Sequence, residues 1–187
     1  MKQRNIEVEL RSVFDEATHK RLKEYLAKTA KNLGEDDKDV FFFLFPDKLL
    51  KVVNNISKKT AKIVLKLNRI GKGSTFDENE IPIAPDDCQK AVDMFLHLGF
   101  KNMQHTFQKR HNYLYKGVEL ALKYSETWGY HLELEIVIHD EAQKQEAVNK
   151  IAEVGNELGV HLLSDDELTE LTKKIDSGFK GGSYKKQ

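Results

Sequence analysis

The first residues of the chain alternate between apolar and charged side chains. Apolar residues at positions 6, 8 and 10 alternate with Glu7, Glu9 and Arg11, which is the period of a β-strand. Because successive side chains of a strand point to opposite faces, these three charged residues share one face. The same pattern recurs in residues 131–138, where Glu133 and Glu135 share a face opposite four apolar residues.

The remaining segments alternate between strand-like and helix-like spacing. Helical spacing begins at Asp15 and is expected to end at Gly34, and further amphipathic helices are expected at 86–98, at 140–158 and after a capping box formed by Ser164 and Glu167. Further strands are expected at 40–45, 49–53, 61–69, 76–83, 106–115, 118–124 and 130–138. Roughly eight strands and four helices, mostly strand next to strand, predict an α+β protein with an antiparallel sheet or barrel.

Isolated charges recur on one face of the later strands. Lys62 and Lys66 share a face, as do Gln108 and Arg110, and Lys51 lies at a comparable position on its strand. Two geometries accommodate this pattern: a flat sheet that exposes its charged face to water, or a closed sheet whose charges line a hydrated interior. The residues alone leave both geometries open.

An inward-facing set of carboxylates would need a cation to offset its repulsion. Oxygen ligands suit a hard divalent ion such as Mg²⁺ or Mn²⁺, which takes part of its coordination shell from substrate phosphates. Lysine and arginine side chains on the same face would match an anion of high charge, such as a polyphosphate. A metal ion together with a polyanion would therefore neutralise both halves of such a cavity.

Composition narrows the class of protein. The chain has 187 residues, with thirty basic and thirty acidic side chains that balance to a net charge of zero, so we expect neither a polybasic nucleic-acid binder nor a nucleic-acid partner. We expect one domain over residues 1–177, a mobile tail over 178–187, and a monomer or homodimer. The single cysteine, Cys88, excludes an internal disulfide, and no apolar stretch approaches the roughly 18 residues of a membrane span. These features predict a cytoplasmic protein without a membrane partner.

Four segments together resemble the CYTH domain superfamily, also called triphosphate tunnel metalloenzymes. Residues 7–11 read EVELR, similar to the Glu-x-Glu-x-Lys strand of that family, and residues 129–135 read GYHLELE, similar to its closing Glu-x-Glu strand. Between them, residues 98–100 read LGF and residues 109–113 read KRHNY, similar to two further family segments. The resemblance extends over residues 5–160.

The resemblance implies a closed eight-stranded antiparallel β-barrel, a tunnel with helices packed outside, that binds a triphosphate with Mg²⁺ or Mn²⁺. It implies metal ligands at four positions, namely Glu7, Glu9, Glu133 and Glu135, of which Glu9 and Glu133 are also the candidates to orient the attacking water. It implies phosphate contacts from Arg11, Lys66 and Arg110, with Lys51 and Lys62 as further candidates, and a supporting carboxylate at Glu80. Lys123 stands where the family usually has an acidic residue, and Val53 and Gln108 stand where basic residues are common.

Several functions are compatible with these residues. The leading hypothesis is metal-dependent hydrolysis of inorganic triphosphate or of a small nucleoside or thiamine triphosphate, with release of phosphate. The alternatives are a class IV adenylate cyclase that makes cyclic AMP from ATP, and a polyphosphate- or nucleotide-binding module without turnover. A flat sheet with a solvated charged face and no ligand is the fourth.

Overall fold

The computed structural model describes residues 6–67, 75–76 and 78–178. The α-helices in this part of the chain are Glu16–Thr29 (α1), Cys88–His97 (α2), Lys144–Glu157 (α3) and Asp165–Gly178 (α4), with short 3-10 helices at Pro85–Asp87 and Glu141–Gln143. The strands are Ile6–Phe14 (β1), Lys31–Glu35 (β2), Lys38–Leu44 (β3), Leu49–Asn55 (β4), Thr60–Lys66 (β5), Thr75–Phe76 (β6), Glu78–Ile83 (β7), Met103–Tyr115 (β8), Val118–Ser125 (β9) and Gly129–Ile138 (β10). Gly178, the first residue of the predicted tail, ends α4, and residues 179–187 lie outside the described residues.

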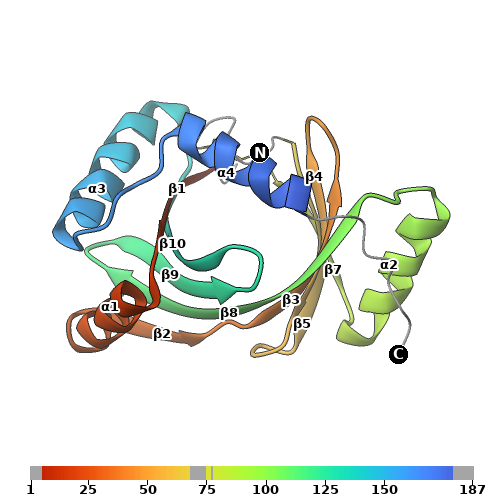
Figure 1. The fold of residues 1–187 in the computed structure, drawn as a ribbon, viewed down its shortest axis with the longest axis horizontal. Coiled ribbons are helices and arrows are strands. Elements are labelled where there is room, and N and C mark those ends of the chain that lie inside the picture. The colour runs from red at the N-terminus through yellow and green to blue at the C-terminus, as the bar shows by residue number, and fades with distance from the viewer. Residues whose placement is uncertain (1–5, 68–74, 77, 179–187) are drawn as a thin grey trace.

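The strands form one curled antiparallel sheet, which confirms the predicted α+β class. Their order is β6-β1-β10-β9-β8-β3-β4-β5-β7, and β2 pairs with β8 beside this path. The sheet bends into a half-barrel, with β1 and β10 in one wall and β4, β5 and β7 in the opposite wall (Figure 1). Closure into the predicted eight-stranded barrel stays a prediction.

The register of β1 against β10 places the two charged motifs side by side. Glu9 is opposite Glu135, and Arg11 is opposite Glu133. Directly opposed residues in an antiparallel pair have neighbouring side chains on the same face. The two segments that resemble the family motifs, residues 7–11 and 129–135, therefore meet on one face of the sheet.

Three helices cover the convex, apolar face of the sheet. Leu22 and Leu26 of α1 and Ile151 of α3 are fully buried in a core with the outward side chains of β1, β8, β9 and β10. On the other wall, Val92 of α2 packs with Phe43 and other residues of β3, β4 and β5. The prediction of helices outside the sheet is confirmed for α1, α2 and α3.

The fourth helix lies across the opening of the half-barrel (Figure 1). The chain leading to it is held to β1 by the Leu163 amide, which donates to the Arg11 carbonyl at 2.8 Å, and near its C-terminal end Asp176 accepts from Gln104 at 3.0 Å. A small apolar pocket between α4 and the concave side is lined by Phe42 and Trp128. This helix thus covers the concave side. The capping box at its start is confirmed, because the Ser164 amide donates to Glu167 Oε2 at 2.8 Å and the Glu167 amide to Ser164 Oγ at 3.3 Å.

The first helix is shorter than the sequence predicts. It ends at Thr29, and residues 31–35 form β2 instead. Leu33, which matched the apolar helical face, is 39% exposed, and Gly34 takes a φ of +92° at an irregularity in the pairing with β8. The prediction of a helix up to Gly34 was wrong because backbone pairing with the distant β8 outcompetes one further helical turn.

No helix of the described residues is both long and apolar enough to cross a membrane.

Candidate metal and phosphate site

The concave face of the sheet encloses a cavity of about 290 Å³. Side chains of seven strands reach it, because alternate residues of each strand point to this side. Nine of the predicted site residues line it: Glu7, Glu9, Arg11, Lys51, Lys62, Lys66, Arg110, Glu133 and Glu135. The structure therefore favours the hydrated interior over a flat sheet with a solvated charged face.

Three of the four predicted metal ligands form a compact group. Carboxylate oxygens of Glu7, Glu9 and Glu135 all lie within 4.8 Å of one another. Burial, together with the charges of Glu7 and Glu9, raises the pKa of the Glu135 carboxyl to about 8. This cluster therefore retains a proton at neutral pH unless a cation replaces it.

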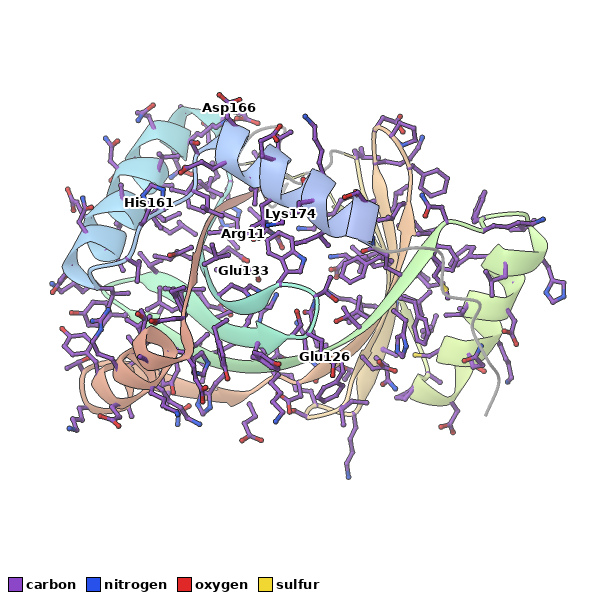
Figure 2. The ribbon with its side chains drawn as sticks, in the orientation of Figure 1. Arg11, Glu126, Glu133, His161, Asp166 and Lys174 are labelled. Atoms are coloured by element: carbon purple, nitrogen blue, oxygen red, sulfur yellow. The ribbon has the colours of Figure 1, made fainter. Side chains whose placement is uncertain are left out.

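Arg11 bridges this cluster to the rest of the cavity. Its Nη2 atom forms an ion pair with Glu9, and its Nε donates to Glu133 Oε1 at 3.2 Å. The side chain is 6% exposed and stacks its guanidinium 5.9 Å from the ring centre of Trp128. Figure 2 shows Arg11 and Glu133 together in the space between the curved sheet and α4.

The fourth predicted ligand, Glu133, lies among cations. Lys123 Nζ is 2.9 Å from its Oε1 atom, and Arg110 Nη1 is 3.5 Å from its Oε2 atom. Burial opposes ionisation of this carboxyl, but Lys123, Arg11 and Arg110 lower its pKa well below the usual range. Glu133 is therefore a fixed anion that organises three cations, and its role as a metal ligand stays a prediction.

A further buried carboxylate, Asp36, organises the basic side of the cavity and was missed from the sequence. It is 3% exposed and lies 2.9 Å from both Lys38 Nζ and Lys58 Nζ, 3.2 Å from Arg110 Nε, and 2.6 Å from Asn55 Nδ2. Burial opposes its ionisation, but the neighbouring lysines lower its pKa strongly. In the sequence this residue lies in an acidic stretch that is typical of a loop, so only its spatial partners identify it.

The substitution Asp36→Asn is expected to destabilise the protein by about 3 kcal/mol, because removing one partner leaves buried cations without a counter-charge. Chemical denaturation would measure this loss. Asp39→Asn is the matched control: Asp39 pairs with the exposed His105 on the outer surface, and its loss should cost no more than about 1 kcal/mol. Equal effects of the two substitutions would contradict the organising role of Asp36.

Glu80, the predicted supporting carboxylate, is not among the residues that line the cavity. It lies on β7 beside β5 and forms an ion pair with Lys62. Both side chains are about 40% exposed, so this pair has little effect on stability. Its structural role is to neutralise and orient Lys62 at the edge of the cavity.

His131 also lines the cavity, as its strand parity with Glu133 predicts. It is 3% exposed, and burial together with the charge of Lys123 lowers its pKa to about 3. Its Nδ1 atom lies 3.0 Å from the Gly129 carbonyl oxygen, which can only accept, so Nδ1 carries the proton. The neutral ring is left with Nε2 as a hydrogen-bond acceptor.

Binding of Mg²⁺ to the three-carboxylate cluster is expected to strengthen as pH rises to about 8, since Glu135 must lose its proton first. The apparent affinity should rise by up to about tenfold per pH unit and level off above pH 8. Calorimetric titrations in two buffers with different ionisation enthalpies would measure the release of about one proton at pH 7. A proton release of zero at that pH would contradict the raised pKa of Glu135.

Comparison with known proteins agrees with this geometry. The family model of the CYTH domain matches residues 5–169. A protein of known structure from Pyrococcus horikoshii OT3, PH1012, is 26% identical, with a TM-score of 0.67 over 87% of this chain and 99% of that chain. No curated protein matches the sequence.

Two more distant structures share the fold. A putative adenylate cyclase from Vibrio parahaemolyticus is 14% identical, with a TM-score of 0.64 over 90% of this chain and 98% of that chain. The Hippeastrum protein HpAC1, described as a putative adenylyl cyclase with a dominant triphosphatase activity, is 16% identical, with a TM-score of 0.59 over 84% and 89% of the two chains.

Proposed function

Because this chain belongs to the CYTH family, we propose that it is a metal-dependent enzyme that hydrolyses inorganic triphosphate or a small organic triphosphate and releases phosphate. One observation carries the proposal: a three-carboxylate cluster and a set of buried, organised cations face the same cavity. A polyphosphate with a divalent ion is the ligand that matches both. The triphosphatase activity of the distant relative HpAC1 supports the same choice.

The residues of the cluster fit a hard divalent ion. The oxygens of Glu7, Glu9 and Glu135 lie within 4.8 Å of one another, a spacing that ligands at opposite or adjacent corners of a coordination shell of about 2.1 Å can adopt after small side-chain shifts. Carboxylate-only ligands favour Mg²⁺ or Mn²⁺ over softer metals. When bound, such an ion supplies charge that polarises the phosphoryl group under attack.

The chain's own cations would hold the phosphate groups. We propose that Arg11, Lys66 and Arg110 bind the phosphates nearest the cluster, and that Lys51 and Lys62 bind the more distant part of the substrate. Lys66 supports this placement, since it lines the cavity and its Nζ lies 3.4 Å from Glu7 and 4.0 Å from Glu9. Fixed cations stabilise the charge that spreads over the phosphoryl oxygens during transfer.

The attacking water would be oriented by a carboxylate of the cavity. Glu9 and Glu133 are the candidates, because both line the cavity and both contact Arg11. We also propose that the sheet closes into a barrel around the substrate: β6 pairs with β1 at one edge, and β7, which starts two residues later, pairs with β5 at the other. Closure would exclude bulk water and strengthen each of these charge interactions.

The experiment that tests the function is product analysis with the purified chain. Inorganic triphosphate, ATP, GTP and thiamine triphosphate are each incubated with Mg²⁺ or Mn²⁺, and products are separated by chromatography. We expect phosphate, with no reaction after chelation of the metal. Cyclic AMP and pyrophosphate from ATP would establish the cyclase instead, the reaction for which the Vibrio protein is named.

A binding module without turnover predicts a different result. Triphosphate with Mg²⁺ would raise the melting temperature by mass action, yet no phosphate would appear over hours. The absence of both stabilisation and turnover with all four substrates would overturn the proposed function.

A further inference from the structure

The charges of the cavity are distributed unevenly between its carboxylates. Lys123 Nζ and Arg11 Nε lie 2.9 and 3.2 Å from Glu133 Oε1, and Arg110 Nη1 lies 3.5 Å from Glu133 Oε2. Both oxygens of this one carboxylate are therefore already occupied by cationic donors. A metal ion at Glu133 would lie against these like charges, which oppose its binding.

The three carboxylates of the cluster, Glu7, Glu9 and Glu135, contact fewer cations. Arg11 pairs with Glu9, and Lys66 lies 3.4 Å from Glu7, while Glu135 has no ion pair within 4.0 Å among the described residues. Among the described residues, Arg11 and Lys66 are thus the side-chain cations within 4.0 Å of these three carboxylates, whereas Glu133 alone contacts three cations. The imbalance favours added positive charge at the three-carboxylate cluster over added charge at Glu133.

Lys123 is the cation that contacts Glu133 but, among the described residues, forms no ion pair with the three-carboxylate cluster. It is 5% exposed, and its register on β9 places it beside both His131 of β10 and Arg110 of β8. Two-metal phosphoryl-transfer sites hold their ions about 3.5–4 Å apart between shared carboxylates. In this cavity the remaining predicted ligand is Glu133, and the Lys123 ammonium lies 2.9 Å from its Oε1 atom.

We propose that the Lys123 ammonium replaces a second metal ion, so that the cavity holds a single divalent ion at Glu7, Glu9 and Glu135. This inference rests on the proposed function. Lys123 then acts as a fixed cation that holds Glu133 in place and faces the phosphates. The cavity then holds two cations, the divalent ion and the Lys123 ammonium, and only the divalent ion can dissociate.

The charge of the lining agrees with one ion. Among the described residues, eight lysines and arginines and six carboxylates line the cavity, a formal excess of two positive charges. One divalent ion brings this to four, which equals the charge of a fully ionised organic triphosphate ester. A second divalent ion would leave two positive charges without a counter-ion.

The number of bound ions tests the proposal directly. Bound Mn²⁺ per chain is counted by electron paramagnetic resonance of the free ion, with Mn²⁺ alone and with saturating imidotriphosphate, a non-hydrolysable analogue. We expect one ion per wild-type chain. We expect a second in Lys123→Glu, which exchanges the ammonium for a ligand, together with the line broadening of two neighbouring Mn²⁺ ions.

Lys109→Glu is the matched control, because it makes the same change of charge one residue away from Arg110 on the opposite face of β8. It should bind one ion. Two ions on the wild-type chain would overturn the proposal. A single ion on a folded Lys123→Glu variant would also overturn it. If that variant does not fold, the number of ions on the wild-type chain decides between one metal ion and two. Absence of any bound Mn²⁺ would instead overturn the proposed metal centre itself, and the one-ion proposal with it.

Discussion

Arg11→Ala is expected to lower the rate of phosphate release on the order of 10³-fold, the magnitude seen when an arginine that stabilises a phosphoryl-transfer transition state is removed. The reason is its position: one guanidinium contacts both Glu9 and Glu133 and lines the cavity between the acidic and basic sides. Its removal takes a proposed phosphate contact away and leaves Glu9 and Glu133 with less counter-charge. Steady-state phosphate release with inorganic triphosphate and Mg²⁺ would measure the loss.

Two further variants separate the chemical effect from the structural one. Arg11→Lys keeps the charge but has a single ammonium that can reach only one of the two carboxylates, so we expect activity between those of wild type and alanine. Arg21→Ala removes an arginine of α1 that donates to the Leu158 carbonyl at 3.0 Å, away from the cavity, and should leave turnover per folded molecule unchanged. Full activity in a folded Arg11→Ala chain would remove this residue from the proposed site.

Glu135→Gln is expected to weaken metal binding strongly without destabilising the metal-free protein. Losing one of three carboxylate ligands should weaken Mg²⁺ binding by at least about 100-fold, more than the effect of removing a supporting group. The amide nevertheless resembles the protonated carboxyl that burial and the neighbouring charges of Glu7 and Glu9 favour up to a pKa of about 8. The substitution should thus lower the Mg²⁺ affinity without lowering the free energy of unfolding of the metal-free protein.

The sign of the stability effect follows from that pKa. The native carboxyl of Glu135 retains its proton up to about pH 8, whereas the unfolded one loses it near the ordinary glutamate pKa of 4.5. Native protein therefore binds more protons in this window, and this group lowers the free energy of unfolding as pH rises from about 4.5 to 8, by at most about 1.4 kcal/mol per pH unit. The Glu135→Gln variant lacks this decline, and denaturation at pH 6 and pH 8 would measure the difference.

Glu119→Gln is the control for both effects. Glu119 is opposite Glu135 on the neighbouring strand and lines the same cavity, but it lies outside the three-carboxylate cluster and accepts from Asn112 at 3.3 Å. We expect Glu119→Gln to bind Mg²⁺ like the wild type. Equal loss of metal affinity in the two variants would show that overall cavity charge, and not the cluster, determines binding.

The fold and the charged lining could be predicted well from the sequence because strand geometry is local. A residue's face depends only on its parity along the strand, so the positions of Glu7, Glu9 and Arg11 on one face needed no tertiary information. The same rule identified the inward lysines of β5 and the carboxylates of β10, all of which line the cavity. Where backbone pairing with a distant strand decided the outcome, as in residues 31–35, local spacing predicted the wrong element.

The pairing of the charges was decided by the tertiary structure alone. Glu133 contacts Arg11 from 122 residues away, and Asp36, between β2 and β3, contacts Arg110 of β8. These contacts determine which carboxylates are neutralised by side chains and which are left for a metal ion, because the Coulomb energy depends on distance in space and not along the chain. The sequence by itself thus determined which residues face the cavity, and only the folded sheet decided which of them meet.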